Sequence, residues 1–215
     1  MWPVLVLVVL TLGAGPASTV RVDDWDAQPA GPLNLSAAWQ RYPPEVTPFN
    51  RPPAVVTDGG RRVLELATTS EAMRIGRDLK IDLAATPWLS WEWKALVLPD
   101  GGDVRDARRN DQAGRVMVAF EGMKGIQYVW DTTAPVGTEA RPDELELFRR
   151  VLVVVRSGPG QKGRWLRERR NVSEDFRRLF NADPPPVKLV GVESHSNDTR
   201  TRAAVRFGTL RFDAR

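Results

Sequence analysis

The chain has 215 residues, no cysteine and a formal net charge of +4, from 31 Lys and Arg against 27 Asp and Glu. The lack of cysteine excludes disulfides, thiolate metal sites and a lipid-modified cysteine anchor. The near balance of charges predicts a mixed surface and not a basic one, so we expect no nucleic-acid partner.

The N-terminus has the pattern of an export signal. The apolar run Val4 to Leu12 is shorter than the ~20 residues of a membrane-spanning helix, and Gly15 and Ala17 are the small residues that signal peptidase requires. We therefore expect residues 1–17 to be a cleaved signal peptide and residues 18–215 to form one periplasmic or secreted domain without a membrane span. A buried N-terminal strand is the alternative, because no Lys or Arg precedes the apolar run.

The first part of the chain predicts short strands joined by turns. A strand over residues 21–25 precedes a proline-rich extended crossover over residues 27–53. Asp58-Gly59-Gly60 is a strong turn signal. The two alternating runs that follow, residues 63–67 and 72–77, are predicted to form a hairpin.

Two apolar runs, Trp88 to Leu98 and Arg115 to Phe120, are predicted to be central strands. A period of two places Trp91 and Trp93 on one buried face of the first run. The loop over residues 100–113 is longer than a hairpin turn requires. We expect it to be ordered over one mouth of the domain and held by ion pairs between its alternating Asp and Arg side chains.

The rest of the chain predicts further strands and one helix. The strands are expected over residues 125–130, 151–155, 165–172, 187–192 and 203–212. The helix is expected from Ser173 to Asn181, with Asn171 or Ser173 as its cap. One short helix among about nine strands predicts an all-β protein, an antiparallel β-sandwich of jelly-roll type.

Several short segments resemble one family when they are read in order. They are Leu89 to Lys94, Asn110 to Val116, Glu168 to Val172 with Asp175-Phe176, and Ser196 to Thr199. In their order and spacing these segments resemble a family of bacterial secreted proteins called domain of unknown function 3047. The resemblance covers Leu64 to Phe212. The resemblance implies a periplasmic or secreted protein and a galactose-binding-like sandwich. It implies no particular reaction.

The tryptophans allow two interpretations. Trp91, Trp93 and Trp130 on a concave sheet would make a platform for sugar rings. Tryptophan at alternating positions of a central strand is more often core, which is the interpretation we favour. Trp88 and Trp165 are then the better candidates for exposed rings.

Our main functional prediction is a non-catalytic, monomeric domain that binds a carbohydrate or another cell-envelope ligand in a polar cleft. The prediction rests on the sandwich class and on polar residues concentrated at strand ends. The expected ligand-binding residues are Asp111, Arg115, Glu168, Asn171, His195, Asn197 and Asp198.

The alternative is a glycoside hydrolase or lyase. Glu92 and Glu168 could act as a carboxylate pair if their side chains lie ~5 to 10 Å apart on one face. Ion pairs within the sheet explain the same two residues without chemistry and are the interpretation we favour. His195 is the only histidine, and without a Gly-x-Ser-x-Gly elbow or further metal ligands it indicates neither a serine hydrolase nor a zinc site.

We expect no cofactor, with a structural calcium ion as the alternative. Carboxylates supply the hard oxygen ligands that calcium prefers, but the interleaved Arg105, Arg108 and Arg109 would repel a cation. The carboxylates in question are Asp100, Asp103, Asp106 and Asp111, or Asp23 and Asp24.

Overall fold

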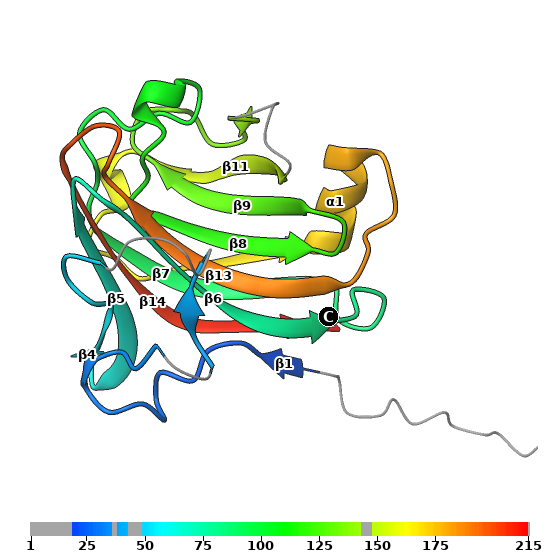
Figure 1. The fold of residues 1–215 in the computed structure, drawn as a ribbon, viewed down its shortest axis with the longest axis horizontal. Coiled ribbons are helices and arrows are strands. Elements are labelled where there is room, and N and C mark those ends of the chain that lie inside the picture. The colour runs from blue at the N-terminus through cyan, green and yellow to red at the C-terminus, as the bar shows by residue number, and fades with distance from the viewer. Residues whose placement is uncertain (1–18, 36–37, 43–48, 143–147, 215) are drawn as a thin grey trace, which may run out of the picture.

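The computed structural model describes residues 19–35, 38–42, 49–142 and 148–214, which form two packed β-sheets (Figure 1). The predicted all-β sandwich is confirmed. The expected signal peptide, residues 1–17, lies outside the described residues. Within the described ranges no helix is long and apolar enough to cross a membrane.

Within the described residues, sheet A and sheet B each contain seven strands. The strands of sheet A are β1 (Thr19–Arg21), β2 (Gly31–Pro32), β4 (Ala54–Asp58), β5 (Arg61–Thr69), β7 (Trp88–Val97), β12 (Leu166–Asn171) and β14 (Arg202–Asp213). The strands of sheet B are β3 (Gln40–Arg41), β6 (Ala72–Ile81), β8 (Gly114–Phe120), β9 (Lys124–Asp131), β10 (Glu139–Ala140), β11 (Arg149–Ser157) and β13 (Val187–His195). The helical elements are η1 (Ala107–Arg109), η2 (Pro159–Gln161) and α1 (Val172–Phe180).

The connectivity is of jelly-roll type, because the long strands β5, β6, β7 and β8 alternate between the two sheets. The order is β12-β7-β14-β5-β4-β2 in sheet A, where β1 also pairs with β14, and β10-β11-β9-β8-β13-β6-β3 in sheet B. One pairing, β9 with β11, is parallel and departs from the predicted antiparallel pattern. The chain crosses back between these strands instead of turning directly, and a parallel pair requires such a crossover.

The predicted hairpin over residues 63–67 and 72–77 is wrong. β5 pairs with β4 and β14 in sheet A, whereas β6 pairs with β3 and β13 in sheet B. The turn at Ser70, whose φ is 53°, therefore takes the chain from one sheet to the other. The hairpin in this region joins β4 to β5 instead, through Gly59 and Gly60 with φ of 59° and 80°, as a two-residue hairpin turn requires.

The core lies between the sheets and follows the predicted alternation. Trp91, Trp93 and Trp130 are at most 1% exposed. The Trp91 ring stacks on Tyr128 with centroids 5.3 Å apart, and the Trp93 ring lies 5.7 Å from that of Trp130. The core interpretation of these three tryptophans is confirmed, and they do not form a sugar platform. Val97, at the end of the same strand, is 40% exposed.

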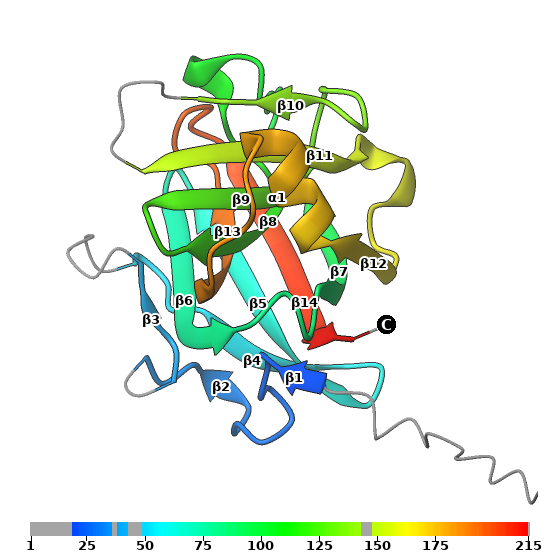
Figure 2. The ribbon, with the colours of Figure 1, turned by 90° about the vertical axis from the view of Figure 1, so that its right-hand side faces the viewer.

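Helix α1 covers one end of the sandwich beside β12 (Figure 2). It begins, as predicted, with Asn171 as its cap, since the Asn171 side chain accepts a hydrogen bond from the backbone N–H of Glu174. Asp175 fixes the helix to the sheets by accepting hydrogen bonds from the Tyr128 hydroxyl at 2.8 Å and from Arg170 at 2.6 and 2.9 Å. The loop over residues 100–113 lies at the other end of the strands (Figure 1).

Candidate functional site

The outer face of sheet B carries a group of polar side chains from four neighbouring strands. The register places Glu193 of β13 between Arg74 of β6 and Arg115 of β8. His195 follows on the same face of β13, and Gln127 of β9 donates a 2.9 Å hydrogen bond to Glu193. We call these five residues the Arg115 cluster.

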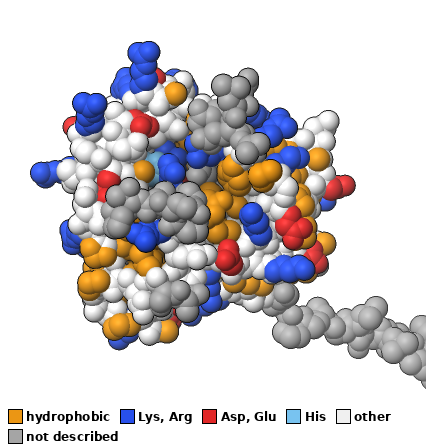
Figure 3. All heavy atoms as spheres, in the orientation of Figure 1, with side chains coloured by type: hydrophobic (Ala, Val, Ile, Leu, Met, Phe, Trp, Pro, Cys, Tyr) orange, Lys and Arg blue, Asp and Glu red, His pale blue; other side chains and the backbone are white. Residues whose placement is uncertain are grey.

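The Arg115 cluster is buried although it lies on the outer side of a sheet. Arg115, Gln127 and Glu193 are each 1% exposed, and His195 is 2% exposed. The Arg74 side chain is 29% exposed and is the one member that reaches solvent to any extent. Figure 3 shows this face of the molecule, where a few histidine atoms are visible beside Lys and Arg atoms.

Hydrogen bonds connect the cluster to the loop that precedes β8. The Arg115 guanidinium donates to the backbone carbonyl of Asn110 and, at 3.4 Å, to the side-chain oxygen of Gln127. Arg115 and Glu193 form an ion pair with a long separation of 3.9 Å. Arg115 therefore links the loop to the acid at the centre of the cluster.

Burial and neighbouring charges set the protonation states. Burial, reinforced by the positive charge of Arg115, lowers the pKa of His195 to about 3. Burial alone would raise the pKa of Glu193, but His195, Arg74 and Arg115 favour its charged form and lower the pKa to about 2. Burial lowers the pKa of Arg115 to about 10. At neutral pH the site therefore contains neutral imidazole, one carboxylate and two guanidinium groups.

The cluster leaves a donor and an acceptor unpaired. Within the described residues, Arg115 Nε and Glu193 Oε2 are buried without a hydrogen-bond partner. His195 Nε2 lies 3.0 Å from Arg74 Nε and 3.0 Å from Glu193 Oε2. The imidazole nitrogen accepts the hydrogen bond from Arg74, and a neutral nitrogen that accepts cannot also donate to Glu193, so Glu193 Oε2 is left without this hydrogen bond. Each buried polar group without a partner costs about 1–3 kcal/mol.

The loop over residues 100–113 is fixed beside the cluster. Asp131 accepts hydrogen bonds from the backbone N–H of Val104 at 3.0 Å and from the Gln112 amide at 3.1 Å. The expected ion pairing inside the loop is present between Arg105 and Asp103, at 2.6 Å. The order of this loop thus depends strongly on Asp131, a residue that sequence reasoning did not single out.

Four of the seven predicted ligand-binding residues come together at this end of sheet B. Arg115 and His195 belong to the cluster. Asp111 is buried and accepts two 2.7 Å hydrogen bonds from Thr199. Burial and the nearby charge of Asp111 raise the pKa of Asp198. Asn197, a fifth predicted residue, is exposed next to Asp198.

The other two predicted residues lie elsewhere. Glu168 faces the space between the sheets at the edge of sheet A, where it accepts hydrogen bonds from Trp93 Nε1 at 3.1 Å and from Arg156 at 2.5 Å. Asn171 caps helix α1. Both residues belong to β12 in the other sheet, so they do not lie together with the other five.

The carboxylate pair of the alternative is excluded, and the ion pairs that we favoured are present, between Glu92 and Arg167 at 2.7 Å and between Glu168 and Arg156 at 2.5 Å. Glu92 lies opposite Arg167 and points to the outer face of sheet A, whereas Glu168 lies opposite Trp91, whose side chain is buried in the core. Trp91 and Glu92 are neighbours in β7 and therefore point to opposite faces of the sheet. Glu168 shares the face of Trp91, so the carboxylates of Glu92 and Glu168 lie on opposite faces and cannot act on one bond.

Sequence reasoning missed three members of the cluster, Arg74, Gln127 and Glu193. A usable signal was present, because Glu193 and His195 alternate with Val192 and Ser194 in an otherwise apolar strand. Charged or polar residues at alternate positions of a buried strand must pair or face a cleft.

Two carboxylates of the calcium alternative, those of Asp23 and Asp103, are held by arginine. Asp23 binds Arg21 at 2.8 Å and accepts from the backbone N–H of Leu210 at 2.6 Å, and Asp103 binds Arg105. In the part of the chain that the structure describes, no three His, Asp or Glu side chains gather in a way that could hold a metal ion.

Comparison with known proteins gives a family and distant structural neighbours. No curated protein matches the sequence significantly. The xyloglucanase domain of NopAA, a type three effector from Sinorhizobium fredii solved with cellobiose, is 10% identical, with 80% of this chain and 91% of that chain covered and a TM-score of 0.43. The family 11 xylanase from Neocallimastix patriciarum is 11% identical, with 76% and 88% covered and a TM-score of 0.39. At these TM-scores the likeness carries no information on function.

The sequence itself matches a family over most of its length. The matching region, residues 53–211, runs from just before β4 into β14 and includes every member of the Arg115 cluster. The chain therefore belongs to the family described as "Protein of unknown function (DUF3047)".

Proposed function

We propose that this protein is a non-catalytic carbohydrate-binding domain and that the Arg115 cluster is its ligand site. One observation carries the proposal, namely that an unpaired buried donor, Arg115 Nε, and an unpaired buried acceptor, Glu193 Oε2, belong to one ion pair. A sugar hydroxyl can accept a hydrogen bond from the first atom and donate one to the second. A ligand with neighbouring hydroxyl groups would satisfy both.

The surroundings of the cluster support a role beyond holding the fold together. Met117, Ala119 and Leu189 form a separate buried apolar group on the outer face of the same sheet. Apolar side chains are therefore sufficient to form a buried surface on this face of sheet B, and the fold does not require charged residues there. Buried ion pairs are often no more stabilising than apolar residues of similar volume, so stability alone does not explain Arg115 and Glu193.

The chemistry of the cluster favours binding over hydrolysis. Glycoside hydrolysis ordinarily needs one protonated and one ionised carboxyl group. The cluster contains a single carboxylate, Glu193, whose pKa of about 2 keeps it ionised and unable to serve as a general acid at neutral pH.

Arg74 is the proposed entrance to the site. It is the most exposed member of the cluster and lies 3.0 Å from His195. Rotation of this long side chain would open a path to Glu193 without moving the sheet. The nearby exposed residues Asn197 and Asp198 would then contact the outer part of the ligand.

Glycan binding by matched carboxylate variants tests the proposal. The wild-type protein is screened on a glycan array, and the affinity for each hit is measured by calorimetry for Glu193→Gln and for Asp183→Asn, which removes an exposed carboxylate that belongs to neither proposed site. For at least one hit we expect Glu193→Gln to weaken binding at least ~10-fold, because a charge-assisted hydrogen bond contributes about 1.5–3 kcal/mol, and Asp183→Asn to leave it unchanged. The absence of any glycan hit, or equal affinity of the Glu193→Gln variant for every hit, would refute the proposal. Circular dichroism confirms that both variants are folded.

We also propose that the protein is exported to the periplasm or secreted after removal of residues 1–17. The support is the short apolar run and the small residues Gly15 and Ala17. N-terminal sequencing of the protein expressed in a bacterium is expected to begin at Ser18. An N-terminus at Met1 in the soluble protein would contradict the proposal.

A further inference from the structure

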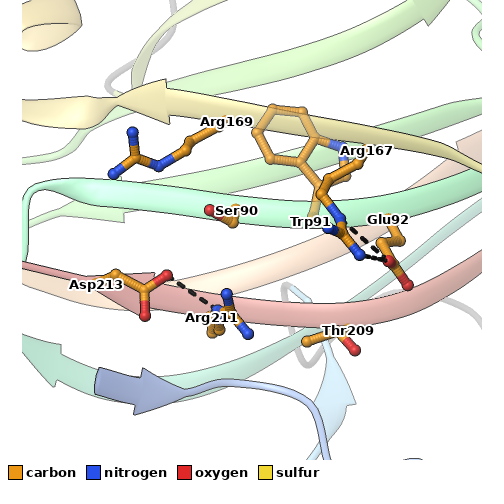
Figure 4. A pocket seen from close by; sticks show the side chains of 8 residues that line it. All are labelled: Ser90, Trp91, Glu92, Arg167, Arg169, Thr209, Arg211 and Asp213. Atoms are coloured by element: carbon orange, nitrogen blue, oxygen red, sulfur yellow. Dashed lines mark hydrogen bonds and ion pairs between the residues drawn. The ribbon is translucent and has the colours of Figure 1, made fainter. Parts of the chain in front are cut away.

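The outer face of sheet A carries a second polar site, far from the Arg115 cluster. It is an open groove with a volume of about 300 Å³ that runs over three neighbouring strands (Figure 4). We call it the sheet A groove. Its polar lining includes Ser90 and Glu92 of β7, Arg167 and Arg169 of β12, and Arg211 and Asp213 of β14.

Positive charge exceeds negative charge in the sheet A groove. Glu92 is bound on two sides, by Arg167 at 2.7 Å and by Arg61. Asp213 is bound by Arg211 at 2.9 Å. The lining contains three guanidinium groups, of Arg167, Arg169 and Arg211, against two carboxylates, so the groove attracts anions.

Arg169 is the guanidinium best placed to bind a ligand. Among the described residues it has no carboxylate partner. Its guanidinium carbon lies 3.9 Å from the centre of the Trp88 ring, so that the indole orients it. An oriented guanidinium with free N–H groups can form a bidentate pair with a carboxylate.

Two tryptophans lie beside the groove without lining it. Trp88 stacks against Arg169, and Trp165 stacks against Arg61, a partner of Glu92. Trp88 is the first residue of β7, and Lys94 lies six residues further along the same strand. The Trp165 ring lies close to Lys94, with its centre 5.1 Å from the Lys94 ammonium. At ~3.3 Å per residue these positions are about 20 Å apart. Both rings are half-buried, and they are the two tryptophans expected to be the better exposed.

We propose that the sheet A groove binds an acidic polysaccharide, a chain of sugars that carry carboxylate groups. Arg169 pairs with a sugar carboxylate, and the Ser90 hydroxyl and the carboxylates of Glu92 and Asp213 bind sugar hydroxyls. The edges of the Trp88 and Trp165 rings pack against the sugars at either end.

The two carboxylates of the groove favour a glycan over a nucleic acid. Glu92 and Asp213 have side chains that are 15% and 13% exposed and line the same groove as the guanidinium groups. A continuous phosphate backbone would pass directly over these negative charges. Sugar hydroxyls, by contrast, can donate hydrogen bonds to them.

The experiment measures binding of polygalacturonate to the full-length mature protein by calorimetry. The variants are Arg169→Ala, Arg169→Lys and, as a control of equal charge change, Arg108→Ala, which removes an exposed arginine on η1 outside the groove. We expect Arg169→Ala to weaken binding about tenfold, since one charge-assisted pair is lost. Arg169→Lys should recover only part of the affinity, because lysine cannot bind a carboxylate in the bidentate manner. Arg108→Ala should bind like the wild type, and methyl esterification of the polymer should weaken binding.

Several outcomes would overturn the proposal. They are no binding of polygalacturonate, an equal loss for Arg108→Ala and Arg169→Ala, or tighter binding of a single-stranded oligonucleotide that depends on Arg169. The Glu193→Gln variant separates this proposal from the one for sheet B. It should keep its affinity for polygalacturonate, whether or not the Arg115 cluster binds a sugar.

Discussion

The titration of His195 offers a direct test of the buried cluster, because it is the only histidine in the chain. In the folded protein its pKa is lowered to about 3 by burial and by Arg115, whereas histidine in an unfolded chain titrates near 6.5. Below pH 6.5 the unfolded chain therefore binds a proton that the folded chain does not bind. Stability must fall as the pH falls from about 6.5 towards 3, with a slope of at most about 1.4 kcal/mol per pH unit. Between pH 6.5 and pH 5 the loss is about 2 kcal/mol.

Urea unfolding followed by tryptophan fluorescence at pH 7, 6 and 5 measures this slope. The comparison is with His195→Gln, which removes the titrating group. The raised pKa values of Asp131 and Asp198 act in the opposite direction, but they are common to both proteins, so the difference between the two slopes reports His195. A pKa near 6.5 for the histidine by NMR, or equal slopes in the two proteins, would show that His195 is not buried beside Arg115 as described.

Three further predictions follow from individual residues. Replacement of Asp131 by Ala leaves buried backbone donors unpaired, so it should destabilise the protein by at least about 2 kcal/mol and expose Arg105 to rapid tryptic cleavage, which we expect the wild type to resist. Replacement of Asp175 by Ala removes the partner of the buried Tyr128 hydroxyl and of Arg170, whose side chain is 35% exposed, and should cost about 2–3 kcal/mol in urea unfolding, whereas Asp183→Ala, which removes an exposed partner of Arg177, should change stability little. Addition of EDTA should leave the Tm of the wild type unchanged, and a marked fall in Tm would indicate a bound structural metal.

The sequence predicted the strands well because burial on one face imposes a period of two. In β7, Leu89, Trp91, Trp93 and Ala95 are all buried as expected. The pattern identifies the buried face of a strand but not its partner, and for that reason the hairpin of β5 with β6 was wrong. β5 pairs instead with β4, the strand just before it, and with the remote strand β14, where Leu64 lies opposite Phe207 near the other end of the chain.

The site was only partly predictable for the same reason. Arg115 and His195 stood out as polar residues beside buried ones, and adjacent strands bring them together. Glu168 stood out in the same way, but its strand belongs to the other sheet and its side chain faces Trp93. A charged residue inside a predicted strand indicates that its side chain forms an ion pair or faces a cleft, but the partner depends on strand pairing and register, which the sequence pattern does not show.

The polar groups of the two proposed sites differ in how much they destabilise the folded protein. The guanidinium groups of the sheet A groove are exposed, so their attraction for an anion is screened by salt and their presence costs the fold little. Arg115 and Glu193 are buried, 3.9 Å apart, with one unpaired atom each. Desolvation of such a pair is only partly offset by the attraction between its charges, whereas the neighbouring Met117 and Leu189 cover the same face without that cost. A hydroxyl-bearing ligand that pairs both atoms would recover what burial loses, and this gives the Arg115 cluster a reason to remain polar that the fold alone does not provide.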